Sequence, residues 1–312
     1  MPTRDQIQQE FAKLGAHDVL RRRYLKELYD YTNNSTILYA ASFNSNRLPG
    51  IPGHVLSIAQ HDIQGFMSAL SGIAGESLDL ILHSQGGSLE AADQIVQYLR
   101  SKFGRIRAIV PQNAMSAATM IACACDEIVM GKHSAIGPID PQITLPTPTG
   151  HFTAPAHAIL SEFEQARKDI IADPRTAPLW VNKFNTYPAG LLTMCGDTID
   201  LAKEKVAGWL ERFMFKGSAT AHETAKDASA WLANAAIHKT HGRPISLEQA
   251  RSIGLKVVPL EEDQSFQEHV LSVFHATMLT FESSNCMKLI ENHNGKGWFV
   301  NVNIQLVPSA TP

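Results

Sequence analysis

The chain has 312 residues, of which 44% are hydrophobic and 18% are charged. This balance supports a substantial buried core and excludes a disordered or low-complexity protein. Lysine and arginine number 27 against 30 aspartates and glutamates, so the net charge of −3 offers no basic excess for a nucleic acid or an anionic membrane.

The expected compartment follows from the cysteines and the apolar segments. Four cysteines in a chain of this length are too few for a disulfide scaffold. The first residues are polar and no apolar stretch follows them, so no secretory signal is expected. The longest apolar stretch, residues 108–125, is interrupted by Pro111, Asn113 and Ser116 and does not fit a membrane span. We therefore expect a cytoplasmic protein without a membrane span.

The first half of the chain predicts helices followed by strand–helix alternation. Ile7, Phe11 and Leu14 recur at helical spacing in the first 34 residues. Strands are expected at 36–43, 78–83, 106–110 and 127–130, and helices at 62–70, 89–102 and 117–125. Short apolar strands separated by helices of this length indicate βαβ units and a mainly parallel sheet.

The second half predicts a more helical segment and a β-rich tail. A loop rich in proline and threonine is expected at residues 144–155. Helices are predicted at 156–171, 199–215, 221–237 and 247–253, and a strand at 255–260. In the tail from residue 274, Asn294-Gly295 between two apolar runs indicates a hairpin. The expected organisation is an N-terminal helical segment at 1–34, a main domain at 35–273 and a β-rich extension at 274–312.

Two turns of small residues directly follow predicted buried strands, and each opens a helix. The first turn, residues 83–88, contains Gly86 and Gly87, which allow backbone N–H groups to face a ligand. An oxyanion hole for acyl transfer requires such groups. The same residues also fit a plain tight turn between a strand and a helix.

The second turn, residues 113–120, contains Ser116 between small neighbours, which leave space for a substrate backbone to approach the hydroxyl. If the two turns are adjacent in a parallel sheet, the amide of Ala117 faces the same crevice as that of Gly87. Ser116 also fits a helix cap, which is a common role of serine.

A nucleophilic serine needs a base. The pattern places none of the 13 histidines convincingly, His83 and His133 included. A lysine is the alternative, provided that burial keeps it neutral. From the residues alone, the candidates are Lys168, Lys183, Lys203 and Lys205.

The sequence predicts neither a metal nor a cofactor. It contains no glycine-rich phosphate-binding motif. Cys123 and Cys125 would face different sides of a helix, and no third ligand is in register with His238 and His241.

Four ordered segments resemble those of one family. Residues 81–88 (Ile-Leu-His-Ser-Gln-Gly-Gly-Ser) resemble its strand and H-[ST]-P-G-G element, and residues 110–121 resemble its nucleophile segment. Residues 125–131 and 135–142 resemble the strand and the turn that follow. The chain is thus similar to the serine dehydrogenase proteinase group, which is similar to signal peptide peptidase A and, more distantly, to the ClpP/crotonase superfamily.

The resemblance implies an α/β fold built as a ClpP/crotonase-like spiral of ββα units. It also implies a homo-oligomeric serine endopeptidase that acts on peptides or unfolded proteins through a Ser/Lys dyad. The site residues that carry over are Ser116 as nucleophile, Gly87 and Ala117 as oxyanion-hole amides, and Gly86, Ser88 and Met115 in substrate binding. Lys168 carries over as the base, with Lys203 or Lys205 as alternatives.

The sequence departs from the family pattern in three places. Gln85 replaces the usual proline before the glycines, and Ala118 stands where glycine is common. Residues 137–141 read Gly-Pro-Ile-Asp-Pro where ClpP-type enzymes have a histidine, which argues against a Ser/His/Asp triad. Two other interpretations therefore stay open: a non-catalytic scaffold of the same fold, and a crotonase-type enzyme acting on acyl-CoA.

Overall fold

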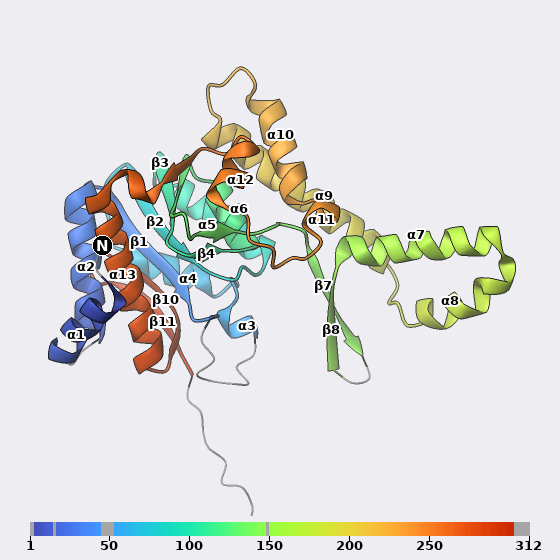
Figure 1. Cartoon of the computed structure of the whole chain (residues 1–312), viewed down its shortest axis with the longest axis horizontal. Coiled ribbons are helices and arrows are strands. Elements are labelled where there is room, and N and C mark those ends of the chain that lie inside the picture. Colours follow the sequence, from blue (N-terminus) through green and yellow to red (C-terminus); the bar gives the residue numbers. More distant parts are fainter. Residues whose placement is uncertain (1–2, 15–16, 45–52, 148–149, 303–312) are drawn as a thin grey trace, which may run out of the picture.

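The computed structural model describes residues 3–14, 17–44, 53–147 and 150–302, so the last ten residues of the expected extension lie outside the described part. At the centre is a seven-stranded sheet in the order β11-β10-β1-β2-β3-β5-β9 (Figure 1). Its strands are β1 (Ser35–Ala41), β2 (Ser77–His83), β3 (Arg105–Val110), β5 (Glu127–Met130), β9 (Val257–Pro259), β10 (Cys286–Asn292) and β11 (Gly297–Asn301). Within this sheet, five neighbouring strands run parallel to one another, namely β1, β2, β3, β5 and β9. The strands β10 and β11 add an antiparallel edge. The predicted mainly parallel α/β sheet is confirmed.

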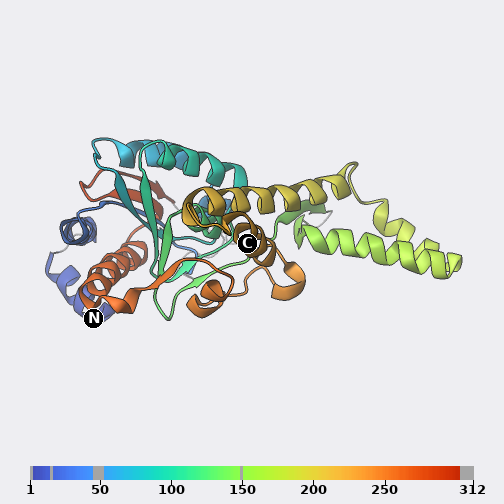
Figure 2. The ribbon, with the colours of Figure 1, turned by 90° about the horizontal axis from the view of Figure 1, so that it is seen from above.

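Helices cover both faces of this sheet, which explains why its strands are apolar on both sides (Figure 2). Along β2, Leu80 packs in one core and Ile81 in the other, because successive side chains of a strand point to opposite faces. The helices on the Leu80 face include α4 (Asp62–Leu70), α5 (Leu89–Arg100), α6 (Ala117–Cys123), α9 (Leu191–Trp209), α10 (Ala221–Leu232) and α12 (Leu247–Ser252). The helices on the Ile81 face are α1 (Arg4–Leu14), α2 (His17–Thr32) and α13 (Gln264–Ser283).

A hairpin and two helices project from this body, and we call residues 142–190 the arm (Figures 1 and 2). The arm consists of β7 (Gln142–Thr147), β8 (Gly150–Pro155), α7 (Ala156–Ala172), the 3-10 turn Pro174–Thr176 and α8 (Ala177–Phe184). Residues 144–155 were expected to form a loop, and this expectation is wrong, because most of them belong to the hairpin. Prolines are compatible with it because each strand of a two-stranded sheet has an outer edge that needs no N–H donor.

The remaining elements of the described residues are short. They are α3 (Gly53–Leu56), β4 (Asn113–Ala114), β6 (Ala135–Ile136), the π-helical turn Leu210–Met214, α11 (Ala235–His238) and the 3-10 turn Leu260–Glu262. Residues 274–283 were expected in a β-rich tail but form the end of α13, since Val270, Phe274 and Phe281 share its buried face. The hairpin at Asn294-Gly295 is confirmed, and Gly295 has the positive φ of 75° that such a turn requires. Among the described residues, no helix is long and apolar enough to cross a membrane.

Candidate active site

Ser116 lies at a strained junction between a strand and a helix. Its φ of 53° and ψ of −121° are unusual for a residue that carries a side chain. It occupies the position before the first residue of α6, yet its side chain forms no capping hydrogen bond, which removes the helix-cap interpretation. The side chain is half-buried, so the hydroxyl is neither packed into the core nor fully exposed. Such strain is typical of functional turns whose surroundings fix the backbone.

Hydrogen bonds on both sides hold this turn in place. Ser84 donates its N–H to Asn113 O at 3.0 Å and accepts from the Met115 N–H at 2.9 Å. In the first turn of α6, the Thr119 hydroxyl donates to Ala114 O at 2.7 Å and accepts from the Gly137 N–H at 2.9 Å. These bonds tie the end of β2, β4 and the start of α6 together around Ser116.

Gly86, the first of the two glycines after β2, lies directly against Ser116, so the two turns are neighbours. A Cβ atom added at Gly86 would lie 2.6 Å from the Ser116 Cβ and 3.0 Å from the Ala117 N. The φ of Gly86 is 98°, so both space and backbone conformation require glycine there.

The amide of Gly87 is directed away from its neighbouring segment. Ile58 bridges residues 86–88 in parallel, donating to Gly86 O at 2.8 Å and accepting from the Ser88 N–H at 2.9 Å. In such a bridge the central residue directs its own N–H to the other side. The Ala117 N–H is in the first turn of α6 and has no acceptor within the helix. The Gly87 N–H thus points away from Ile58, and the Ala117 N–H directly follows Ser116 in the chain.

The other two expected substrate contacts have identifiable structural roles. The Ser88 hydroxyl caps α5 by accepting from the Ala91 N–H at 3.1 Å. The side chain of Met115 lies against Gly137, where a Cβ atom would be 3.1 Å from the methionine sulfur. Met115 is half-buried, so it forms one wall beside Ser116.

Lys168 is not brought to Ser116 within one copy of the chain. It lies exposed on α7, which packs against β8, α8 and α9. At the helical rise of about 1.5 Å per residue, it stands about 18 Å along α7 from Ala156, where the helix leaves the hairpin. Figures 1 and 2 both show α7 running away from the body that holds α6.

The alternative lysines are engaged elsewhere. Lys205 on α9 donates to Asp93 on α5 at 2.6 Å. Lys203 lies 3.8 Å from Asp200 on the same helix. Lys183 in the arm pairs with Glu162, which places it beside α7.

Neither candidate histidine is arranged as a base. The ring of His83 is buried between Phe43 and Phe274, and burial lowers its pKa to about 4, so it is neutral at neutral pH. His133 bonds the carbonyl of Pro111 at 2.9 Å.

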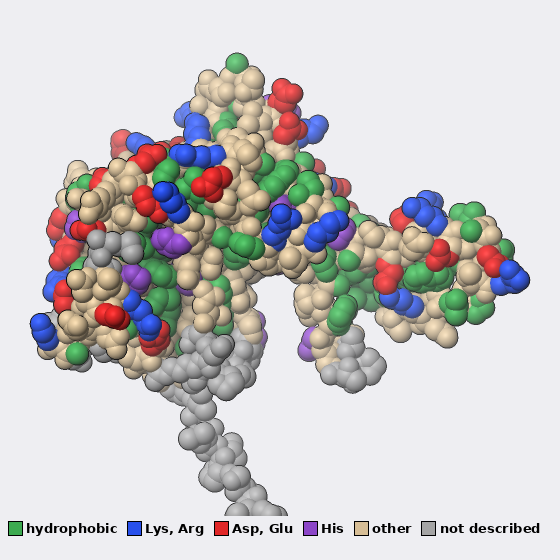
Figure 3. Space-filling model, viewed as in Figure 1, with side chains coloured by type: hydrophobic (Ala, Val, Ile, Leu, Met, Phe, Trp, Pro, Cys, Tyr) green, Lys and Arg blue, Asp and Glu red, His purple; other side chains and the backbone are tan. Residues whose placement is uncertain are grey.

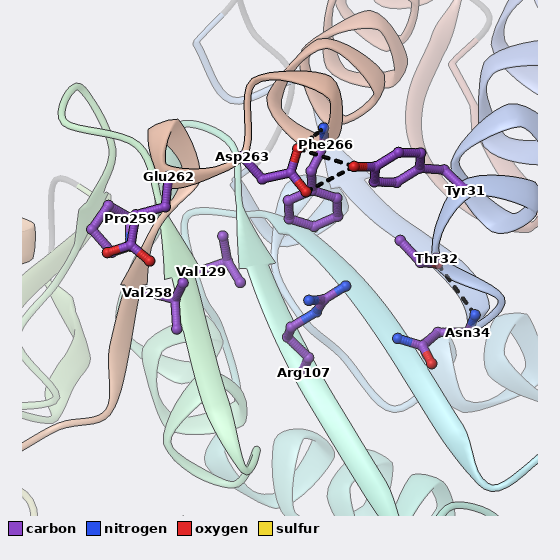
Figure 4. Close-up of a pocket in the computed structure, with 10 residues that line it drawn as sticks. All are labelled: Tyr31, Thr32, Asn34, Arg107, Val129, Val258, Pro259, Glu262, Asp263 and Phe266. Atoms are coloured by element: carbon purple, nitrogen blue, oxygen red, sulfur yellow. Dashed lines mark hydrogen bonds between the residues drawn. The ribbon is translucent and has the colours of Figure 1, made fainter.

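A cavity of about 480 Å³ lies near the N-terminal end of β3, away from Ser116 (Figure 4). Arg107, near the start of that strand, points into it together with Tyr31 and Asp263, which are hydrogen-bonded to each other. Ser116 follows the other end of β3, so this cavity is separate from the candidate active site.

Sequence reasoning missed the residues that support the glycine turn from behind. Ile58 holds it directly, and Asp62 and Lys288 form a fully buried ion pair beside Ile58. A lysine within the apolar run of residues 286–290 was a visible signal, but its partner is more than 200 residues away in the sequence.

A family model described as "ClpP-like SDH-type serine proteinase" matches residues 13–178, which include both turns of the site. The chain belongs to this family. The match extends from the N-terminal helices into the arm, and it agrees with the mainly parallel sheet and with the resemblance found in the sequence.

Two relatives of the chain are named as uncharacterised proteins. The chain is 31% identical over 240 residues to "Uncharacterized protein MJ0137" of Methanocaldococcus jannaschii, covering 76% of this chain and 73% of that protein. It is 44% identical over 66 residues to "Uncharacterized protein MJ1495" of the same organism, covering 21% of this chain and 23% of that protein.

Among solved structures, two mutants of the "1510-N membrane-bound stomatin-specific protease", one with a substrate peptide, are similar at 16% identity. They cover 81% of this chain and 94% or 89% of theirs, with TM-scores of 0.36 and 0.37, which are too low to support an argument.

The structure shows the contacts made at two of the three departures from the family's pattern, Gln85 and Ala118. The Gln85 side chain donates to Gly53 O and to Ser57 Oγ, both at 3.2 Å, and so ties the glycine turn to the segment beside it. Ala118 is fully buried in the core on the Leu80 face of the sheet, so its methyl group packs inward. Both departures are compatible with an intact turn.

Proposed function

We propose that this family member is a serine endopeptidase that forms an acyl-enzyme at Ser116. The observation that supports this most is the strained Ser116 backbone against Gly86, with the Gly87 N–H directed away from Ile58 and the Ala117 N–H directly after Ser116. A nucleophile with two amide donors is the arrangement that acyl transfer requires. The two relatives are named as uncharacterised proteins, so they add no support for this activity.

The proposed reaction has two steps. The Ser116 Oγ attacks the carbonyl carbon of the peptide bond, and its proton passes to a neutral lysine. The amides of Gly87 and Ala117 bind the oxyanion, which is worth about 3–4 kcal/mol for one donor in measured cases. The lysine then protonates the leaving amine, and water hydrolyses the ester to restore Ser116.

Lys168 is our proposed base, acting from a second copy of the chain. Within one copy it projects on the arm, whereas Lys205 and Lys203 are paired with the carboxylates of Asp93 and Asp200. The arm also exposes large apolar side chains, with Ile171 at 76% and Leu179 at 78% exposure. Exposed apolar residues of this size are typical of protein interfaces. Burial of the arm against a neighbour would supply the desolvation that a neutral lysine needs.

A fluorophosphonate probe tests the nucleophile. We expect the wild type to be labelled at Ser116 and Ser116→Ala to lose both labelling and peptidase activity while its thermal unfolding midpoint stays close to that of the wild type. Ser101→Ala, which removes an exposed serine at the end of α5, is the matched control and should be labelled normally. Labelling of Ser116→Ala at the wild-type rate would refute the assignment.

A further inference from the structure

A buried ion pair lies behind the glycine turn. Lys288 of β10 and Asp62 at the start of α4 are both fully buried, and the Lys288 Nζ is 2.6 Å from the Asp62 Oδ1. The Tyr39 hydroxyl donates to the other carboxylate oxygen at 2.8 Å. Buried ion pairs are often no more stabilising than well-packed apolar side chains. A role in fixing a geometry is therefore a reasonable explanation for this pair.

The two charged side chains bind the backbone on either side of Ile58. The Lys288 Nζ donates to Ser57 O at 2.9 Å. The Ala59 N–H donates to the Asp62 Oδ2 at 3.0 Å. Residues 57–59 are thus fixed at both ends by one ion pair.

Ile58 in turn fixes the backbone on either side of Gly87. Its N–H and carbonyl bond Gly86 and Ser88, as described above. The fit is close, since a Cβ atom at Gly87 would lie 2.3 Å from Ile58 O and 2.4 Å from Ile58 N. A small shift of residues 57–59 therefore moves the Gly87 amide.

We propose that Lys288 and Asp62 are positioning residues that aim the Gly87 amide at the oxyanion by fixing residues 57–59. This inference rests on the proposed function, in which the Gly87 amide binds the oxyanion. Neither side chain is required to touch the substrate, because the connection runs through Ile58. Tyr39 completes the network, and burial raises its pKa well above the ordinary value, so that it stays a neutral donor to Asp62.

The test removes both charges together, so that neither is left buried alone. The variant carries Lys288→Met and Asp62→Asn. The matched control carries Arg107→Met and Asp79→Asn, which removes another ion pair, with a fully buried aspartate, from the opposite end of the sheet. For the first variant we expect kcat on a peptide substrate and the rate of fluorophosphonate labelling to fall about ten- to a hundredfold, with KM changed less than about threefold. The control should keep kcat within about threefold of the wild type.

Hydrogen exchange provides a measurement that does not depend on activity. We expect the Ile58 and Ser88 amides to lose protection by about tenfold or more in the Lys288/Asp62 variant and not in the control. Tyr39→Phe, which removes a single bond to Asp62, should change both measurements in the same direction by a smaller factor. It takes the place of the double variant if that protein does not fold.

The outcomes separate this inference from the proposed function. Wild-type protection of both amides together with a wild-type labelling rate in the Lys288/Asp62 variant would overturn the inference. Equal loss of kcat in the variant and the control would overturn it as well. If the wild type is not labelled at all, the proposed function fails, and the exchange of the Ile58 and Ser88 amides still decides whether the ion pair fixes this turn.

Discussion

At the scale of single residues, Ser116 combines backbone strain with an accessible side chain. A non-glycine residue at a φ of 53° costs about 1–3 kcal/mol, and such a conformation persists only where the surroundings fix it. The bonds of Ser84 and Thr119 to the neighbouring backbone supply that constraint. The strained conformation does not stabilise the fold, and it agrees with the proposed role of Ser116 as nucleophile.

His83 makes the stability of the protein depend on pH. Its folded pKa of about 4 lies below the ordinary value of 6.5, because burial disfavours the charged ring. As the pH falls below about 6.5, the unfolded chain binds a proton that the folded chain does not, so the free energy of unfolding falls until the pH reaches about 4. The loss is up to about 3 kcal/mol from this residue. Urea unfolding at a series of pH values between 7 and 4.5 measures it.

The comparison variant for this prediction is His83→Asn, which does not titrate. Its absolute stability will be lower because the ring contacts with Phe43 and Phe274 are lost. The diagnostic quantity is the slope against pH, which should be shallower than in the wild type. His275 and His293, whose pKa values are also lowered by burial, contribute equally to both proteins. Identical slopes would contradict the prediction.

At the scale of elements, the proposed site is made by the meeting of two turns rather than by either alone. The turn after β2 supplies the Gly87 amide, and the junction of β4 and α6 supplies Ser116 and the Ala117 amide. The adjacent positions of β2 and β3 in the sheet bring them together. A substitution in one turn should therefore affect the chemistry of the other.

Gly87→Ala tests this dependence. The added methyl group would overlap the backbone of Ile58, so residues 57–59 or the turn must move, and we expect fluorophosphonate labelling of Ser116 to fall at least about tenfold. Gly150→Ala is the matched control, since Gly150 also has a positive φ, 134°, but faces open space. It should cost about 1–3 kcal/mol of stability from backbone strain and leave labelling unchanged. Equal labelling rates in the two variants would argue against the arrangement.

At the scale of the whole molecule, the arm separates the proposed base from the nucleophile. The space-filling view shows apolar side chains along this projection (Figure 3). This surface and the position of Lys168 on the arm are the basis for the proposed assembly, in which each site takes Ser116 from one copy and Lys168 from another.

Mixing two inactive variants tests such a shared site. We expect Ser116→Ala and Lys168→Ala each to be inactive alone. If the copies exchange, an equal mixture should recover activity at about a quarter of its sites, because each active site needs the intact residue from both copies. Peptidase activity after co-refolding measures the recovery.

The control is a mixture of Ser116→Ala with a second variant that carries both Ser116→Ala and Lys168→Ala. No copy in this mixture has Ser116, so it should stay inactive. Full activity of Lys168→Ala alone would remove it as the base. Lys203→Ala and Lys205→Ala would then show which of the two alternatives is required.

The sequence by itself determined the sheet, most helices and the two turns of the site. Those features depend on local patterns: apolar runs of strand length, helical spacing and glycines at a turn. It did not determine the hairpin at 142–155, whose strands pair at the edge of an arm and carry little apolar alternation. It also missed the helical start of the expected tail, because a buried helix and an apolar strand have similar composition over a short run.

Only the tertiary structure decided which residues meet. The bonding of Ile58 to the glycine turn, the pairing of Lys288 with Asp62 and the distance of Lys168 from Ser116 all depend on contacts between distant segments. Local patterns cannot encode such contacts, since burial of a charge or the direction of an arm is settled by packing across the whole chain.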